Sequence, residues 1–182
     1  GLNEPACWIA DGALGIWAAI NEQSPGSAQQ RCTNHKTMNV LDKLPKDEQP
    51  EYTPRLRAIW QAESEKMARK LAGGVVHDLR EAGYDRAADC LEDDLDRCLT
   101  FYKFPEPHWS HLRTTNVVES PFAAVRLRTN AAKRFKKTKS GVHLMHQVMQ
   151  RISKRWRRLK SAHLCSTVTL PKSSKKSKSQ AA

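Results

Sequence analysis

Two carboxylates lie where metal-dependent chemistry is common in α/β proteins. Asp11 follows a short apolar run, residues 6–10, that has the length and composition of a buried strand. A carboxylate at the carboxyl end of such a strand faces the crevice where these folds place catalytic groups. An Asp-Gly pair after a strand is more often a simple turn, so the local pattern makes Asp11 a candidate and no more.

Glu119 is the second candidate, and it is the only acidic residue between residues 113 and 182. One local interpretation makes Asn116 the N-cap of a helix, with Glu119 completing a capping box. Another makes Ser120 the N-cap and Pro121 the first helical residue. Both put Glu119 in or beside a first helical turn. A carboxylate there can coordinate a metal, and the helix N-terminus favours phosphate.

Cys32 and His35 are three positions apart, which matches one of the two ligand pairs of a structural zinc site. A structural zinc site needs four ligands, and no second Cys/His pair appears at a suitable spacing. We therefore favour an imidazole that donates to a phosphate or orients a carboxylate. The five cysteines are odd in number and irregularly spaced, which favours reduced thiols over a disulfide framework.

The charge is strongly one-sided. Residues 1–112 hold 13 Lys/Arg and 18 Asp/Glu, whereas residues 113–182 hold 18 Lys/Arg and one acid, a net +17. A basic half of this kind indicates a polyanionic partner, of which nucleic acid is the most common. A basic surface that only aids solubility is the competing interpretation. No apolar run approaches 18 residues, so we expect no membrane span.

These candidates need elements to position them. After the strand at 6–10, we expect a helix up to Pro25-Gly26, a second strand within 28–33 and a helix from 34 to 44 that Pro45 ends. Residues 46–112 have helical stripes of apolar residues that indicate ordinary core packing, with breaks near Gly83 and at 105–107. One such stripe consists of Met67, Leu71, Val75 and Leu79. The acidic residues at 92–96 are expected to form a solvated helical face.

The basic half has its own pattern. We predict a basic helix that ends near residue 130, a basic loop over 131–140 and an amphipathic helix over 141–160. The apolar face of that last helix would consist of Met145, Val148, Met149, Ile152, Trp156 and Leu159. Residues 171–182 are low in complexity and are expected to be disordered.

Taken in order, these segments resemble the C-terminal half of the Mutator-type bacterial insertion-sequence transposases. The resemblance runs from about residue 6 to residue 160 and depends on many ordered blocks rather than one motif. The blocks are residues 9–17, 30–36, 39–46, 59–63, 99–105, 108–116, 119–120, 125–129 and 155–159. Pro121 departs from the small hydroxyl residue expected after the Glu, but it is well tolerated at a helix start.

The resemblance implies an RNase H-like core with an Asp-Asp-Glu triad. Asp11 would be the second Asp and Glu119 the Glu, and His35 of the family's Cys-x-x-His signature would support the site. The first Asp is expected upstream of Gly1, so we expect a fragment. Three carboxylates can hold two Mg²⁺ (or Mn²⁺) ions for strand cleavage and strand transfer.

The fold class expected is therefore α/β, mostly α in this fragment. A partial RNase H-like core would occupy residues 1–45, a helical insertion 46–112, core helices with Glu119 and a basic surface 113–162, and a disordered basic tail 163–182. The C-terminal basic helix is expected to be long.

DNA is the expected partner, both the terminal inverted repeats of the element and its target. Repeat recognition would belong to the part upstream of Gly1. Arg113, near Glu119, is expected to contact the scissile region. The residues expected to contact DNA are Arg113, Arg126, Arg128, Lys133, Arg134, Lys136, Lys137, Arg155, Arg157 and Arg158.

We also expect a homo-oligomer in the bacterial cytoplasm, associated with the nucleoid. The alternative function is a truncated, catalytically inactive remnant of a transposase that still binds DNA. On that alternative the fragment would bind DNA without cleaving it.

Overall fold

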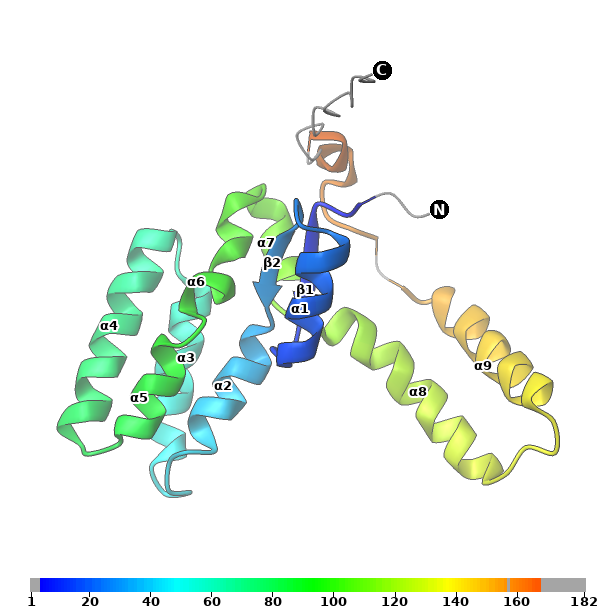
Figure 1. Cartoon of the computed structure of the whole chain (residues 1–182), viewed down its shortest axis with the longest axis horizontal. Coiled ribbons are helices and arrows are strands. Elements are labelled where there is room, and N and C mark those ends of the chain that lie inside the picture. Colours follow the sequence, from blue (N-terminus) through cyan, green and yellow to red (C-terminus); the bar gives the residue numbers. More distant parts are fainter. Residues whose placement is uncertain (1–3, 157, 168–182) are drawn as a thin grey trace, which may run out of the picture.

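A βαβ unit carries Asp11 at the start of the chain (Figure 1). The computed structural model describes residues 4–156 and 158–167. Strands β1 (Cys7–Ala10) and β2 (Ala28–Arg31) pair in parallel, with Cys7 opposite Ala28, and helix α1 (Leu14–Gln23) joins them. Because parallel strands end at the same edge of a sheet, Asp11 and Cys32 are neighbours. The Cys32 amide donates to the Ala10 carbonyl at 2.7 Å. Both predicted strands are confirmed.

Gly12 fits its position for two physical reasons. Its φ of +97° lies in the region that residues with a side chain rarely adopt. A Cβ added here would also lie 2.6 Å from Cζ of Arg31. The Arg31 guanidinium is held at that place by Asp94, 2.6 Å from Nη1 to Oδ2. The turn after Asp11 is thus closed against the end of β2.

The largest core lies in the helical region on the left of Figure 1. Helix α2 (Thr33–Leu41) packs on α3 (Gln49–Gln61) and α5 (Asp85–Glu92), and α4 (Glu65–Glu81) packs on both α3 and α5. The larger core residues are Val40, Leu44, Leu56, Ile59, Trp60, Val75, Leu79, Leu91, Leu99 and Phe101. Burial of these apolar side chains is the main stabilising contribution.

Two predicted features of α4 have different outcomes. The predicted break near Gly83 is confirmed: Gly83 has φ +80°, and the Tyr84 amide donates to the Leu79 carbonyl at 2.8 Å. Together with the bond from the Gly83 amide to the Arg80 carbonyl, this bond forms the Schellman motif that ends helices. Of the predicted apolar stripe, Val75 and Leu79 are buried as expected, but Met67 and Leu71 are exposed. Alanines at 68 and 72 face the core in their place, where small side chains let the helices approach closely.

The acidic residues at 92–96 are solvated as expected except for Asp94, and they do not lie on one continuous helix. Helix α5 ends at Glu92, Asp94 has φ +56°, and the short helix α6 (Leu95–Cys98) follows. Asp94 is mostly buried and pairs with Arg31 and Arg97. The buried Lys36 ammonium donates to the carbonyls of Cys90 and Asp93. The helix is interrupted after Glu92 because Arg31, Arg97 and Lys36 bind the Asp94 side chain and main-chain carbonyls at the C-terminal end of α5.

Short elements connect the core to the basic half. They are η1 (Thr100–Lys103), η2 (Glu106–His108) and α7 (Trp109–Leu112). The aromatic rings of Phe101, Tyr102 and Trp109 pack on one another with centroids 4.2–5.8 Å apart. This aromatic group anchors the chain just before it enters the next long helix.

Helices α8 (Asn116–Ala132) and α9 (Thr138–Ser153) pack on each other and diverge from the helical core (Figure 1). The predicted loop between them is confirmed, but α9 was predicted too long. It ends at Ser153 instead of residue 160, and Trp156, which was predicted on its apolar face, is 54% exposed. Residues 154–160 repeat basic charges without an acid, and like charges one turn apart destabilise a helix.

The last described element is η3 (Ala162–Thr167). The tail that we expected to be disordered, residues 171–182, lies outside the described residues. Among residues 4–156 and 158–167, no helix is both long enough and apolar enough to cross a membrane. The α/β fold that is mostly α is confirmed.

Candidate active site

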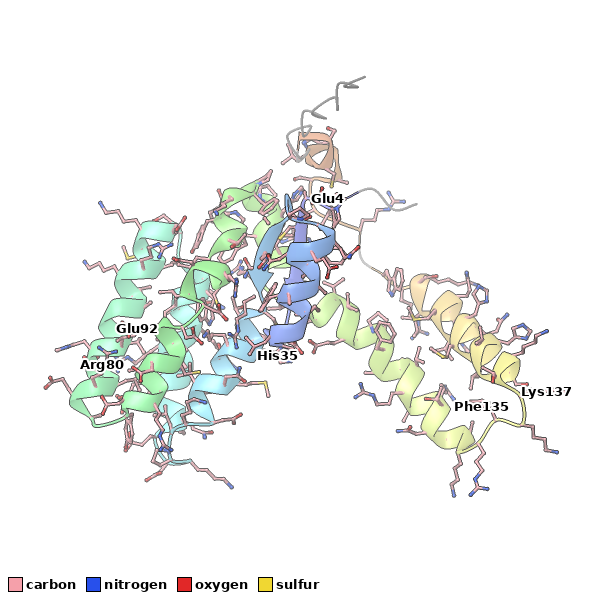
Figure 2. All side chains as sticks on the ribbon, in the orientation of Figure 1. Glu4, His35, Arg80, Glu92, Phe135 and Lys137 are labelled. Atoms are coloured by element: carbon pink, nitrogen blue, oxygen red, sulfur yellow. The ribbon has the colours of Figure 1, made fainter. Side chains whose placement is uncertain are left out.

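Asp11, His35 and Glu119 line one cleft of about 650 Å³. They come from the end of β1, the first turn of α2 and the first turn of α8. Figure 2 labels His35 where α1, α2 and the start of α8 meet. Arg126, one of the predicted DNA contacts, lines the same cleft two turns further along α8. The fold thus gathers three predicted site residues that are distant in sequence.

The Asp11 side chain is exposed in this cleft. Its Oδ1 accepts a hydrogen bond from the Ala13 amide at 3.1 Å, which forms a turn between β1 and α1. The turn and the catalytic interpretations of Asp11 are therefore compatible. The turn sets the direction of the carboxylate, and the cleft gives it access to solvent.

Glu119 lies in the first turn of α8, as both capping interpretations predicted, but both caps are wrong. Thr115 is the N-cap, Asn116 is the first helical residue, and Pro121 lies within the helix. The side chain of Asn116 instead accepts from Asn34 of α2, 3.1 Å away. A contact with a distant element therefore decides the role of Asn116.

Thr115 is a site residue that the sequence analysis missed. Its hydroxyl lies 3.3 Å from Sγ of Cys32 and donates to the Glu119 carboxylate, and its amide donates to the same sulfur at 3.4 Å. Thr115 thereby joins the end of β2 to the start of α8. The sequence carries no local signal for this role, because Cys32 and Thr115 are 83 positions apart.

Cys32 is fully buried beneath the cleft. Burial raises the pKa of its thiol, but contacts with Thr115 and His35 outweigh burial, so the pKa is lower than usual. The neighbouring sulfur, together with the charges of Glu119 and Asp11, raises the pKa of His35, and burial opposes this only in part. Both pKa shifts move the pair in the direction of a thiolate and an imidazolium, relative to the isolated groups.

His35 is placed to act on Glu119. Its Nδ1 lies 3.8 Å from Oε1 of Glu119, and that nitrogen is buried without a hydrogen-bond partner among the described residues. A carboxylate and an imidazole at this separation attract when the imidazole is protonated. The carboxylate-orienting role of His35 stays a prediction.

The segment from Arg113 to Asn116 is fastened to α2. The amide and the hydroxyl of Thr33 both donate to the Arg113 carbonyl, at 2.9 and 3.0 Å. The Arg113 guanidinium donates to the Trp60 carbonyl at 2.6 Å and lies over the ring of Phe101. These contacts give Arg113 a structural role, and its contact with DNA stays a prediction.

The other basic candidates lie on the surface. Figure 2 shows Lys137 at the far tip of the α8–α9 pair, beside Phe135. Arg157 lies outside the described residues. The described candidates other than Arg113 are exposed: Arg126, Arg128, Lys133, Arg134, Lys136, Lys137, Arg155 and Arg158. Their cationic groups are available to phosphates over a long surface that begins at the cleft.

The donor set of Asp11 and Glu119 fits a hard cation. Both carboxylates are accessible from the cleft, and half of the Glu119 side chain is exposed. Carboxylate oxygens are the ligands that Mg²⁺ and Mn²⁺ prefer, with water completing the coordination. Binding of Mg²⁺ or Mn²⁺ by these two residues stays a prediction.

Comparison with known proteins identifies the family. Residues 1–159 match the model described as "Transposase, Mutator family", and the chain therefore belongs to this family. The resemblance noted from the sequence blocks is confirmed.

Three relatives are insertion-sequence transposases. The chain is 42% identical over 152 residues to the transposase for IST2 of Acidithiobacillus ferrooxidans, covering 84% of the chain and 51% of the relative. It is 39% identical over 168 residues to the transposase for IS6120 of Mycolicibacterium smegmatis, covering 92% and 52%. Identity to the transposase for IS256 in Tn4001 of Staphylococcus aureus is 23% over 157 residues, covering 86% and 40%. The chain thus spans about half the length of these relatives.

Proposed function

We propose that this chain carries two of the three metal-binding carboxylates of a DNA transposase. Asp11 would be the second Asp and Glu119 the Glu of an Asp-Asp-Glu site in an RNase H-like core. The observation that supports the proposal is that Asp11 and Glu119, 108 positions apart in the sequence, line one cleft with His35. The helices between them, over residues 46–112, would be the helical insertion.

Each residue of the cleft then has a role. Asp11 and Glu119 would hold Mg²⁺ or Mn²⁺, which when bound supplies activation of a water or a DNA 3′-hydroxyl and stabilisation of the leaving oxygen. His35, 3.8 Å from Glu119, would attract that carboxylate when its imidazole is protonated, a form that its raised pKa favours. Thr115 donates to the same carboxylate and limits its rotation.

The exposed cations of the α8–α9 pair would hold DNA phosphates. Arg126 at the cleft and Lys137 at the tip mark the two ends of this surface. Contacts of this kind position the duplex without reading its sequence. We infer that the bound DNA includes both the ends of the element and its target. The protein would act as a homo-oligomer on the nucleoid in the bacterial cytoplasm.

A metal-binding experiment tests the carboxylates in this chain directly. Asp11→Asn and Glu119→Gln are each expected to weaken Mn²⁺ binding at least about tenfold, measured by the electron paramagnetic resonance signal of free Mn²⁺. Glu22→Gln and Glu63→Gln are matched controls, because both carboxylates are exposed and neither lines the cleft. Equal Mn²⁺ affinity in all four variants would refute the proposed metal site.

Activity is tested in the complete gene product that carries this chain. Asp11→Asn and Glu119→Gln should abolish Mg²⁺-dependent strand transfer of a labelled element end, while DNA binding survives. Wild-type strand transfer in either variant would rule out the assignment. A wild-type product that binds DNA but neither binds Mn²⁺ nor transfers strands would instead support the inactive DNA-binding remnant.

A further inference from the structure

Three side chains of different ligand chemistry converge beneath the cleft. The Cys32 sulfur, a ring nitrogen of His35 and a carboxylate oxygen of Glu119 all lie within 4.8 Å of one another. Sulfur, imidazole and carboxylate are the three protein ligands that Zn²⁺ accepts, at about 2.0–2.3 Å each. In the sequence, Cys32 and His35 lack a second Cys/His pair. The fold supplies the third ligand from α8.

Two further observations indicate that this cluster is built for an ion. The Nδ1 of His35 is buried and has no hydrogen-bond partner among the described residues, which leaves its lone pair or proton unmatched. The Cys32 sulfur accepts a hydrogen bond from the Thr115 amide at 3.4 Å, and the Thr115 hydroxyl, which donates to Glu119, lies 3.3 Å from the same sulfur. Donors of this kind around a sulfur stabilise a thiolate and hold a metal ligand in place.

We propose that Cys32, His35 and Glu119 bind a thiophilic divalent cation, Zn²⁺, with a water from the cleft as the fourth ligand. Three protein ligands and one open position are the arrangement of a zinc site that remains accessible. Binding deprotonates the Cys32 thiol, and the released proton passes to solvent. The site thus differs in chemistry from the oxygen-only site proposed for Asp11 and Glu119.

The two sites share one residue, so their occupants compete. Two divalent cations drawn to the one Glu119 carboxylate repel each other, so occupation of one site weakens binding at the other. This consequence depends on the proposed function, but the zinc site itself does not. Zn²⁺ would therefore act as an inhibitor of the Mg²⁺-dependent reaction and would do so through Cys32.

Cobalt spectroscopy of the purified chain tests the site. Co²⁺ replaces Zn²⁺ in sites of this type, and a cobalt–thiolate bond gives an intense charge-transfer absorption in the near ultraviolet. The wild-type chain should show this absorption, saturate at one ion per chain and lose it when one equivalent of Zn²⁺ is added. Cys32→Ser should abolish the absorption, and His35→Gln and Glu119→Gln should weaken Co²⁺ affinity about tenfold or more.

Two control variants sharpen the result. Cys165→Ser removes an exposed thiol of η3 that is not part of the cluster and should leave the absorption unchanged. Asp11→Asn should also leave it unchanged while weakening Mn²⁺ binding, so failure of the zinc site and failure of the proposed function are distinguishable. Because Cys32 is fully buried, circular dichroism must show that Cys32→Ser folds. If it does not, His35→Gln, at a half-buried residue, decides the test.

Four outcomes would overturn the proposal. The first three are the absence of a thiolate absorption in the wild type, its persistence in a folded Cys32→Ser chain, and Co²⁺ affinity that His35→Gln leaves unchanged. Loss of the absorption in Asp11→Asn would also overturn it, because Asp11 would then belong to the same set of ligands.

Discussion

Gln30 joins the small sheet to the helical core, and its replacement should be severely destabilising. The side chain is fully buried in β2. Its amide nitrogen donates to the carbonyls of Arg31 and Cys98, at 2.6 and 2.8 Å. Its Oε1 accepts from the Phe101 amide at 2.7 Å. One side chain thus satisfies main-chain groups at the end of α6 and in η1.

The cost of Gln30→Leu follows from the groups that lose their partner. Leucine is close to glutamine in volume, so it leaves little cavity, but three main-chain groups lose this partner: the carbonyls of Arg31 and Cys98 and the Phe101 amide. Each such group costs about 1–3 kcal/mol, which predicts a loss of about 3–9 kcal/mol in the free energy of unfolding. Gln30→Glu should cost more, because it turns a buried charge toward two carbonyl oxygens.

Urea unfolding followed by circular dichroism measures these differences, with the free energies obtained by linear extrapolation. The matched control is Gln29→Leu. Gln29 is adjacent in β2 but points to the other face, where its amide reaches the exposed side chain of Asn21. The expected order of destabilisation is Gln30→Glu, then Gln30→Leu, then Gln29→Leu. A Gln30→Leu chain within about 0.5 kcal/mol of the wild type would refute this reasoning.

Three further predictions concern pH, salt and thiol reactivity. The folded pKa of His35 is raised above its usual 6.5, so His35 contributes stability that is fully present below pH 6.5 and is lost as pH rises through the folded pKa. Urea unfolding across this range in metal-free protein should show that dependence in the wild type but not in His35→Gln. Replacing Lys136 and Lys137 with alanine should reduce the salt slope of DNA binding by about 1.8, which fluorescence anisotropy measures; an unchanged slope would mean that the loop does not contact phosphates. A maleimide should label the exposed Cys165 first, whereas Cys98, whose pKa burial raises to about 12, should react only after unfolding. Mass spectrometry of the labelled peptides checks this order, and early labelling of Cys98 would contradict it.

Local patterns in the sequence predicted much of the fold. The apolar run before Asp11 and the stop signals at Pro45 and Gly83 report short-range preferences that the tertiary structure leaves intact. The predicted end of the last helix failed, because an apolar pattern over 141–160 takes no account of repulsion within a basic run. The predicted burial of Met67 and Leu71 on α4 was wrong, because helix packing places the small residues Ala68 and Ala72 in the core and a hydrophobic pattern gives these little weight.

The candidate site was predictable only in part. Asp11 and Glu119 could be named from family blocks and from their positions beside a strand and a helix start. Their local roles could not be decided, because each also fits a turn or a cap. The burial of Asp94 was not predicted either, because its partner Arg31 lies 63 positions away in the sequence.

The sequence by itself determined the membership of the family, the one-sided charge and the succession of elements. These depend on residue order and on interactions within a few positions of the chain. Only the tertiary structure decided what Cys32 touches. The parallel pairing of β1 and β2 brings it beside Asp11, and the fastening of residues 113–116 to α2 brings Thr115 and Glu119 to its sulfur. Contacts between residues more than 80 positions apart arise from packing, which no local pattern encodes.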